Sequence, residues 1–131
     1  MLLQQRAISK YHSGGLYTNT CCSHPRPHED ISDAANRRLQ EEMGMSCALQ
    51  KIFSFEYKAD LDHDLTEWEL DHVFIGKSDS TPVINPLEVE CFEYVTVDWL
   101  LKDLASRPNR YTEWFKASVD KVIAAQRATL K

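Results

Sequence analysis

The chain has 131 residues, of which 43% are hydrophobic and 27% are charged, a size and composition typical of one globular domain. Its 15 Lys and Arg residues against 20 Asp and Glu residues give a formal net charge of -5, which argues against a broad nucleic-acid-binding surface. No apolar run approaches the roughly 20 residues of a membrane-spanning helix, and the N-terminus lacks the apolar core of a signal peptide. We therefore expect a single soluble, cytoplasmic domain over residues 1–131, with neither nucleic acid nor membrane as a partner.

The first half of the chain is predicted to form two strands and a helix. Residues 1–6 and 16–22 are rich in β-forming side chains, and the turn Ser13-Gly14-Gly15 separates them. A helix is expected over residues 31–43, because apolar residues recur every four positions and Gly44 provides a C-terminal stop. Asp30 or Ser32 can cap its start. The charged residues at positions 37, 38, 41 and 42 are expected on its solvent-facing side.

The second half is predicted to contain three strands and two helices. Strands are expected over residues 52–58, 66–76 and 91–97, followed by a helix over 99–105 capped by Asp98 and a last helix over 112–128. This order of elements predicts an α+β fold in which a mixed β-sheet is packed between helices.

The chain has four cysteines, of which Cys21 and Cys22 are adjacent, and it contains no C-x-x-C motif. This usage favours a reduced compartment and a reactive thiol over a disulfide framework. If the segment is a strand, Cys22 and His24 project to one side and Cys21 projects to the other. A lone buried cysteine is nevertheless most often an inert apolar side chain, so the residue pattern alone leaves both interpretations open.

The predicted helix over residues 31–43 carries a dense charge pattern. Glu29, followed seven residues later by Arg37-Arg38-Leu39-Gln40-Glu41-Glu42-Met43-Gly44, resembles the Nudix signature E-x7-R-E-U-x-E-E-x-G-U, in which U is aliphatic. Carboxylates on one helical face suit Mg²⁺, which bridges the oxygens of a diphosphate. The alternative is a solvated helix with an Arg38–Glu42 pair four residues apart.

Two positions depart from the pattern of Nudix hydrolases. Ser23 stands where the leading glycine belongs, and Arg38 stands where the first glutamate of R-E-U-x-E-E belongs. A guanidinium in place of a carboxylate removes a metal ligand and adds a fork that suits phosphate oxygens. The substitution makes hydrolysis a less favoured activity.

The segment Thr18-Asn19-Thr20-Cys21-Cys22-Ser23-His24-Pro25 resembles the active-site signature of the type I isopentenyl-diphosphate isomerases. These are Nudix-fold enzymes of isoprenoid biosynthesis that interconvert isopentenyl and dimethylallyl diphosphate. The resemblance continues through residues 3–10, the modified helix, Tyr57 and Glu67-Trp68-Glu69, and it covers residues 1 to about 117. It implies a Nudix-like fold and an isoprenoid diphosphate substrate. Two alternatives stay open: a Nudix hydrolase of another diphosphate, and a non-catalytic remnant that acts as a binding module.

The resemblance also implies roles for single residues. Glu69, helped by the phenol of Tyr57, is expected to protonate the alkene, and the thiolate of Cys22 is expected to remove the allylic proton, with the two roles exchanging when the reaction reverses. Trp114 matches a pocket indole whose ring stabilises the developing carbocation, although an ordinary core tryptophan is an equal alternative.

The resemblance further implies two groups of ligands. The diphosphate would be bound by Arg6, Lys10, Arg38 and the backbone around Ser23. One Mg²⁺ ion linked to the diphosphate would be held by Glu42, and a second divalent ion (Mg²⁺, Mn²⁺ or Zn²⁺) by His24, Glu67 and Glu69. Alternation alone would instead make Glu67 and Glu69 the solvent-facing side of an edge strand. Arg37 and Glu41 are expected to be structural.

In the resembled family, a segment with further metal-ligating histidines and a lysine precedes the point where this chain begins. We therefore expect the chain to be N-terminally truncated relative to the family. Metal binding is expected to be weakened by at least about ten- to a hundredfold, with low turnover. Strand 1–6 is expected to be an exposed edge that favours self-association. The test is to titrate metal and to measure conversion of isopentenyl diphosphate, both with this chain and with a chain extended upstream by the family's histidine-bearing segment.

Overall fold

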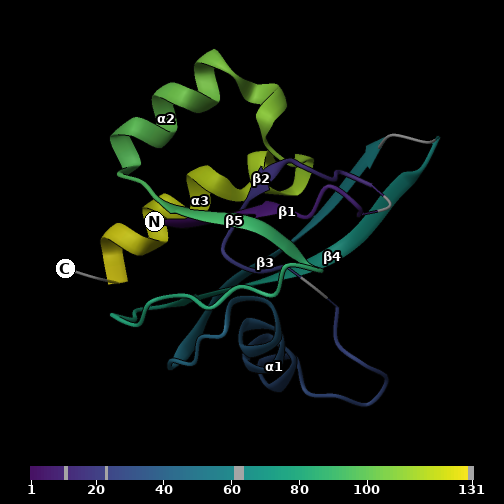
Figure 1. The fold of residues 1–131 in the computed structure, drawn as a ribbon, viewed down its shortest axis with the longest axis vertical. Helices are drawn as coiled ribbons and strands as arrows, with labels where there is room; N and C mark the ends of the chain where they lie inside the picture. Colours follow the sequence, from purple (N-terminus) through teal and green to yellow (C-terminus); the bar gives the residue numbers. More distant parts are fainter. Residues whose placement is uncertain (11, 23, 61–63, 130–131) are drawn as a thin grey trace.

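The chain folds as shown in Figure 1, a computed structural model that describes residues 1–10, 12–22, 24–60 and 64–129, with only the backbone at positions 57, 59, 67, 68 and 129. In chain order the elements are β1 (Leu2–Arg6), β2 (Tyr17–Thr18), α1 (Ile31–Met43), β3 (Leu49–Asp60), β4 (Thr66–Gly76), β5 (Val89–Tyr94), α2 (Val97–Ser106), the short 3-10 helix η1 (Pro108–Arg110) and α3 (Glu113–Thr129). No helix within the described ranges combines the length and apolarity needed to cross a bilayer.

The strands form two sheets, and β1 is the central strand of the first. Its order is β2-β1-β5, with antiparallel pairing on both sides of β1. The second sheet is the long antiparallel hairpin β3–β4, which runs diagonally past the first sheet in Figure 1. Among the described residues, the parallel component is the isolated bridge between Tyr17 and Tyr111. The expectation that residues 1–6 form an exposed edge is wrong, because β1 lies between two strands and pairs with β5 along its length and with β2 at Gln4 and Gln5.

The two faces of β1 are buried in separate apolar clusters. Leu3 packs against α2 and α3, in a cluster that includes Leu100, Phe115 and Val119. Leu2 packs on the other face, in a cluster with Leu39 and Met43 of α1 and with Met45 and Val89. Figure 1 accordingly shows α1 on one side of the first sheet and α2 and α3 on the other. The predicted α+β fold, with a sheet between helices, is confirmed.

Helix α1 begins and ends where the sequence predicts. The side chain of Asp30 accepts hydrogen bonds from the backbone N–H groups of Ser32 and Asp33, at 2.9 and 3.3 Å. Gly44 ends the helix in the left-handed region, with φ 61°, and a Cβ there would lie 2.5 Å from the carbonyl oxygen of Val83. Both the backbone conformation and the close approach of the chain therefore require glycine.

The prediction that positions 37, 38, 41 and 42 all face solvent is wrong for Glu42, which is 3% exposed. The segment before β5 covers this end of α1. The backbone N–H of Val83 donates to the carbonyl of Met43 at 2.8 Å, and that of Asn85 donates to the carbonyl of Glu42 at 2.9 Å. These bonds satisfy carbonyls that lack partners at a helix C-terminus, and they enclose the Glu42 side chain.

Other element boundaries differ from the predictions. β2 is shorter than the predicted 16–22, and β3 is longer than the predicted 52–58. β5 and α3 are shifted from the predicted ranges, and α2 extends beyond the predicted 99–105 at both ends. Helix α2 is capped by Thr96, whose hydroxyl accepts from the backbone N–H of Trp99 at 3.1 Å, so Asp98 lies in the first turn and is not the cap.

A buried carboxylate joins α2 to the start of α3. Asp103 is 6% exposed and accepts hydrogen bonds from the hydroxyl of Tyr111 at 2.5 Å and from Arg107 at 2.7 Å. Arg110 contacts the same carboxylate at 3.2 Å and lies 4.6 Å from the ring centroid of Tyr17. Burial alone would raise the pKa of Asp103, but the bonds from Tyr111 and Arg107 hold it below its ordinary value.

We expect Asp103→Asn to lower the free energy of unfolding by about 2 kcal/mol, because the buried hydroxyl of Tyr111 and the partly exposed Arg107 and Arg110 lose their charged acceptor. The contribution of the carboxylate should be present above the unfolded pKa and should be lost as pH falls, since its folded pKa is lowered. Urea denaturation at neutral and acidic pH measures both effects. Asp98→Asn, on the exposed face of α2, is the matched control, and an equal loss in both variants would contradict the prediction.

Candidate functional site

The segment that carries the two cysteines is an irregular loop, so the strand assumed for residues 16–22 does not extend through them. Hydrogen bonds of its own side chains replace a strand ladder. The hydroxyl of Thr18 lies 2.8 Å from that of Thr112, at the start of α3. Asn19 donates to the carbonyl of Cys21 at 2.6 Å, and Thr20 donates to the carbonyl of Leu2 at 2.6 Å. These contacts hold the loop between β1 and α3.

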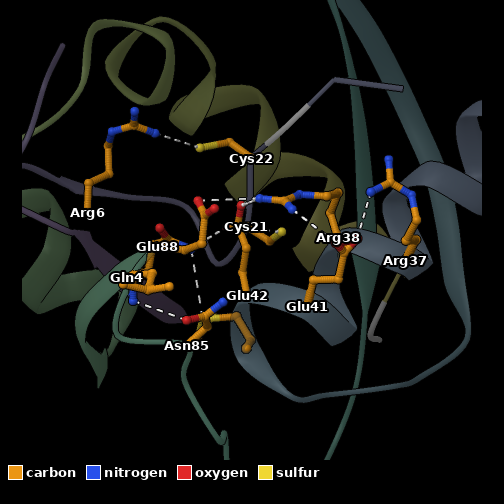
Figure 2. A network of polar contacts seen from close by, with 12 residues as sticks. Gln4, Arg6, Cys21, Cys22, Arg37, Arg38, Glu41, Glu42, Asn85 and Glu88 are labelled. Atoms are coloured by element: carbon orange, nitrogen blue, oxygen red, sulfur yellow. Dashed lines mark hydrogen bonds and ion pairs between the residues drawn. The ribbon is translucent and has the colours of Figure 1, made fainter. Parts of the chain in front are cut away.

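Cys22 contacts Arg6, which in turn lies over the ring of Trp114. Arg6 Nη1 donates to the Sγ atom of Cys22 at 3.6 Å, a contact drawn in Figure 2. The Arg6 guanidinium carbon lies 5.2 Å from the ring centroid of Trp114, within cation-π range. Arg6 and Trp114 are 9% and 8% exposed. Through Arg6, the structure thus links three predicted site residues, of which Arg6 and Trp114 are buried and Cys22 is half-buried.

His12, to which the sequence analysis assigned no role, lies beside Arg6 and Trp114. Its ring lies edge-on to Trp114 with centroids 6.1 Å apart, and its carbonyl accepts from Arg6 at 3.4 Å. No spacing signal links position 12 to position 114, because the contact exists only after β1 has packed beside α3.

Several buried donors have no hydrogen-bond partner within the described structure. They include Arg6 Nε, Arg38 Nε and the indole nitrogen of Trp114. A buried donor without an acceptor is costly, and such groups are rare in folded proteins. A further buried atom without a partner in the described structure, His72 Nδ1, lies on β4. The acceptor oxygens of an anion would suit the donors of Arg6, Arg38 and Trp114.

Burial raises the pKa of Cys22 to about 11, although Arg6 acts to lower it and Glu42 acts to raise it. The pKa of Cys21 is raised further, first by burial and then by the charge of Glu42. A raised pKa favours the thiol form of Cys22 in the ligand-free protein.

We expect Cys22 to react slowly with iodoacetamide at neutral pH and to gain reactivity toward pH 11, because only the thiolate is nucleophilic. Arg6→Gln should move the midpoint to higher pH, since the guanidinium lowers the pKa of this thiol. Alkylation rates of the Cys22 peptide, followed by mass spectrometry across pH, measure both midpoints. A wild-type midpoint near that of a free cysteine would contradict the assignment.

Cys21 has different neighbours from Cys22. Its Sγ atom donates to Glu42 Oε1 at 3.5 Å, and the side chain packs against the apolar cluster of α1. The two thiols therefore have different surroundings, which arise from an irregular loop and not from the alternation of a strand.

Glu42 and Arg38 form a largely buried ion pair. Arg38 Nη2 lies 2.5 Å from Glu42 Oε2, and their side chains are 18% and 4% exposed. Gln4, which is 1% exposed on β1, donates to Glu42 Oε1 at 3.1 Å. The alternative of a solvated helical pair does not describe this contact. The sequence analysis assigned no role to Gln4, because it stands in the polar run Gln4-Gln5-Arg6 and no local signal separates it from its neighbours.

Lys10 and Arg38 meet at a carboxylate that the sequence did not identify. Glu88 forms an ion pair with Lys10, and its Oε2 lies 3.4 Å from Arg38 Nη2. Figure 2 shows Glu88 and Glu42 on the same side of Arg38. Lys10 and Glu88 are 78 positions apart, and no motif connects them.

Arg37 and Glu41 lie on the outer side of α1, as Figure 2 shows. Arg37 binds Glu29 through two hydrogen bonds of 2.8 Å and Glu41 through one of 2.6 Å. The Arg37 hydrogen bonds lower the pKa of Glu29 to about 2. This clamp ties the loop before α1 to the helix, which agrees with the structural role expected for Arg37 and Glu41.

The candidate metal ligands are only partly described. His24 Nε2 lies 3.5 Å from Glu69 Oε2 on β4, so an imidazole and a carboxylate of the expected set face each other. The side chains of Tyr57 and Glu67 and the whole of Ser23 lie outside the described residues, although the backbone register pairs Tyr57 with Glu69. Among described side chains, no three His, Cys, Asp or Glu form a metal-binding group.

Comparison with known proteins gives a consistent result. A model of the NUDIX domain matches residues 1–115. Isopentenyl-diphosphate Delta-isomerase 1 of Aromatoleum aromaticum is 53% identical over 126 residues, which are 96% of this chain and 71% of that protein. Isopentenyl-diphosphate Delta-isomerase of Pectobacterium atrosepticum is 48% identical, over 93% of this chain and 68% of that protein.

The fold also matches a solved structure. The crystal structure of a MutT protein from Methanosarcina mazei superposes with a TM-score of 0.74, at 16% identity, over 99% of this chain and 85% of that chain. At this identity the likeness concerns the fold alone.

Proposed function

Because this chain belongs to the isopentenyl-diphosphate Delta-isomerase family of NUDIX-domain proteins, we propose that it interconverts isopentenyl diphosphate and dimethylallyl diphosphate. The observation that carries the proposal is 53% identity to one such isomerase over 96% of the chain. The contact of Cys22 with Arg6, beside buried donors that lack acceptors, supports it.

The reaction adds a proton to one end of a carbon–carbon double bond and removes another from the allylic carbon, through a state with the character of a tertiary carbocation. We assign the two transfers to Cys22 and Glu69, with Tyr57 assisting Glu69. Because burial raises the pKa of Cys22, we assign its thiol as the proton donor in one direction of the reaction. In the other direction the thiol first loses its proton to solvent, and the resulting thiolate accepts the proton from the allylic carbon.

The carbon skeleton would lie against Trp114, whose ring attracts a developing positive charge. Burial of this indole, at 8% exposure, excludes water, which would otherwise capture a carbocation. The diphosphate would accept hydrogen bonds from Arg6, Lys10 and Arg38 and from the backbone at Ser23. Both arginines have a buried Nε without a partner in the described structure, which fits an anion with many oxygens.

Divalent ions fit the donors that the structure describes. His24 and Glu69 offer the mixed nitrogen and oxygen ligands that Zn²⁺, Mn²⁺ or Mg²⁺ accepts, and Glu67 would complete the set. Glu42 would hold a Mg²⁺ ion shared with the diphosphate, and that ion would neutralise phosphate charge. Because Gln4, Cys21 and Arg38 already bond to the Glu42 carboxylate, any ion there would share it with these side chains.

Incubation of the chain with isopentenyl diphosphate and a divalent ion in D₂O tests the proposal. Dimethylallyl diphosphate carrying deuterium is the expected product, detected by NMR. Release of phosphate without isomerised product would instead indicate a Nudix hydrolase, which Arg38 disfavours. Binding of the diphosphate with no chemical change would indicate a binding module.

A further inference from the structure

The backbone of Glu88 is fixed between the two segments that carry the candidate anion-binding cations. Its carbonyl accepts from the backbone N–H of Ala7 at 3.1 Å, and its own N–H donates to the carbonyl of Asn85 at 2.9 Å. The N–H of Asn85 in turn donates to the carbonyl of Glu42 at 2.9 Å. Residue 88 is therefore tied to the end of β1 on one side and to the end of α1 on the other.

The side chain of Glu88 joins the same two segments. Its carboxylate pairs with Lys10, beyond the end of β1, and lies 3.4 Å from Arg38 Nη2 on α1. Arg38 has a second carboxylate partner in Glu42, at 2.5 Å. Within the described structure the Lys10 ammonium forms no ion pair with another carboxylate, so its position depends on Glu88. The side chains of Lys10 and Glu88 are each 27% exposed, so a ligand from solvent can reach the pair.

We propose that Glu88 is a positioning residue of the diphosphate site. In the free protein its carboxylate is the counter-ion that holds Lys10 beside Arg38. When the diphosphate binds, a phosphate group replaces this carboxylate as the partner of both cations. The inference rests on the proposed diphosphate substrate. In the free protein the carboxylate occupies the place of a phosphate oxygen and keeps the flexible Lys10 side chain at the site. In the complex it remains close to the phosphate as a like charge.

The arrangement predicts whether Glu88 raises or lowers the affinity for diphosphate. An incoming phosphate group must displace the Glu88 carboxylate from Lys10 and Arg38, and because these ion pairs are partly exposed, the competition weakens diphosphate binding only by a few-fold. The negative charge of Glu88 near the diphosphate adds a smaller repulsion. Glu88 therefore limits affinity, and the limit favours release of the diphosphate product after each turnover.

The test measures binding of inorganic diphosphate, in the presence of Mg²⁺, to the wild-type chain, to Glu88→Gln and to Glu90→Gln by calorimetry. Glu90 is exposed on β5, and its replacement removes the same charge from the protein. We expect E88Q to bind diphosphate about fivefold tighter than wild type at low salt, with a smaller difference at high salt. E90Q should bind as the wild type does.

A double-mutant cycle with Lys10→Met shows whether Glu88 acts through Lys10. The gain from E88Q should shrink at least about twofold in the K10M background, and a merely structural role would leave it unchanged. Equal affinities of E88Q and E90Q, weaker binding by E88Q, or an E88Q gain unaltered by K10M would each overturn the inference while the proposed function stands. Absence of diphosphate binding by the wild-type chain would overturn the proposed function and the inference together.

Discussion

Replacement of Cys22 by alanine should lower the turnover of isopentenyl diphosphate by at least about a thousandfold, within the range that a positioned acid or base contributes. The thiol is held by Arg6 at 3.6 Å, and a methyl group in its place can neither give nor accept a proton. Diphosphate affinity should change far less, because the cations are untouched. Steady-state rates and calorimetric titration of C22A with inorganic diphosphate separate the two effects.

Cys21→Ala is the matched control for this experiment. Cys21 contacts Glu42 and the apolar cluster of α1, so we expect a modest loss of stability, about 1 kcal/mol, with most turnover retained. Circular dichroism confirms that both variants fold. Equal losses of activity in two folded variants would show that the assignment of the catalytic thiol is wrong.

The fold was predictable where signals are local. Helix α1 has a capping aspartate, a four-residue apolar repeat and a glycine stop, and both of its ends fall at the predicted residues. The prediction was weaker where side chains compete with the backbone. Residues 19–22 have strand-like composition, but Asn19 and Thr20 bond to nearby carbonyls and prevent a ladder.

Residues of the candidate site could be predicted where they belong to a sequence motif. Residues that reach the site only through tertiary contacts could not. The resemblance selected Cys22, Arg6 and Trp114, which the structure brings together. Periodicity placed Glu42 in solvent, yet the chain around Asn85 and the side chain of Gln4 cover it. Glu88 had no local signal, because its partners come from two other segments of the chain.

Arg38→Glu restores the carboxylate of the hydrolase-type helix, and we expect it to weaken diphosphate binding without creating diphosphate cleavage. In the wild-type protein Arg38 contacts Glu41 at 3.2 Å, Glu42 at 2.5 Å and Glu88 at 3.4 Å. The substitution would remove the cation and gather four carboxylates in a largely buried place. Loss of a charged hydrogen-bond donor to phosphate predicts roughly a hundredfold lower affinity for inorganic diphosphate.

The same substitution leaves Glu42 without its cation, so stability should fall by about 3 to 5 kcal/mol, and R38E has a risk of unfolding. Arg38→Gln keeps a neutral donor beside Glu42 and tests diphosphate affinity with less strain. Arg37→Gln, which breaks only the outer clamp to Glu29 and Glu41, is the control for loss of one positive charge from α1. It should bind diphosphate as the wild type does. If folded R38E released phosphate from a nucleoside diphosphate conjugate and kept the wild-type affinity for isopentenyl diphosphate, Arg38 would not be the anion-binding residue that separates this chain from the hydrolases.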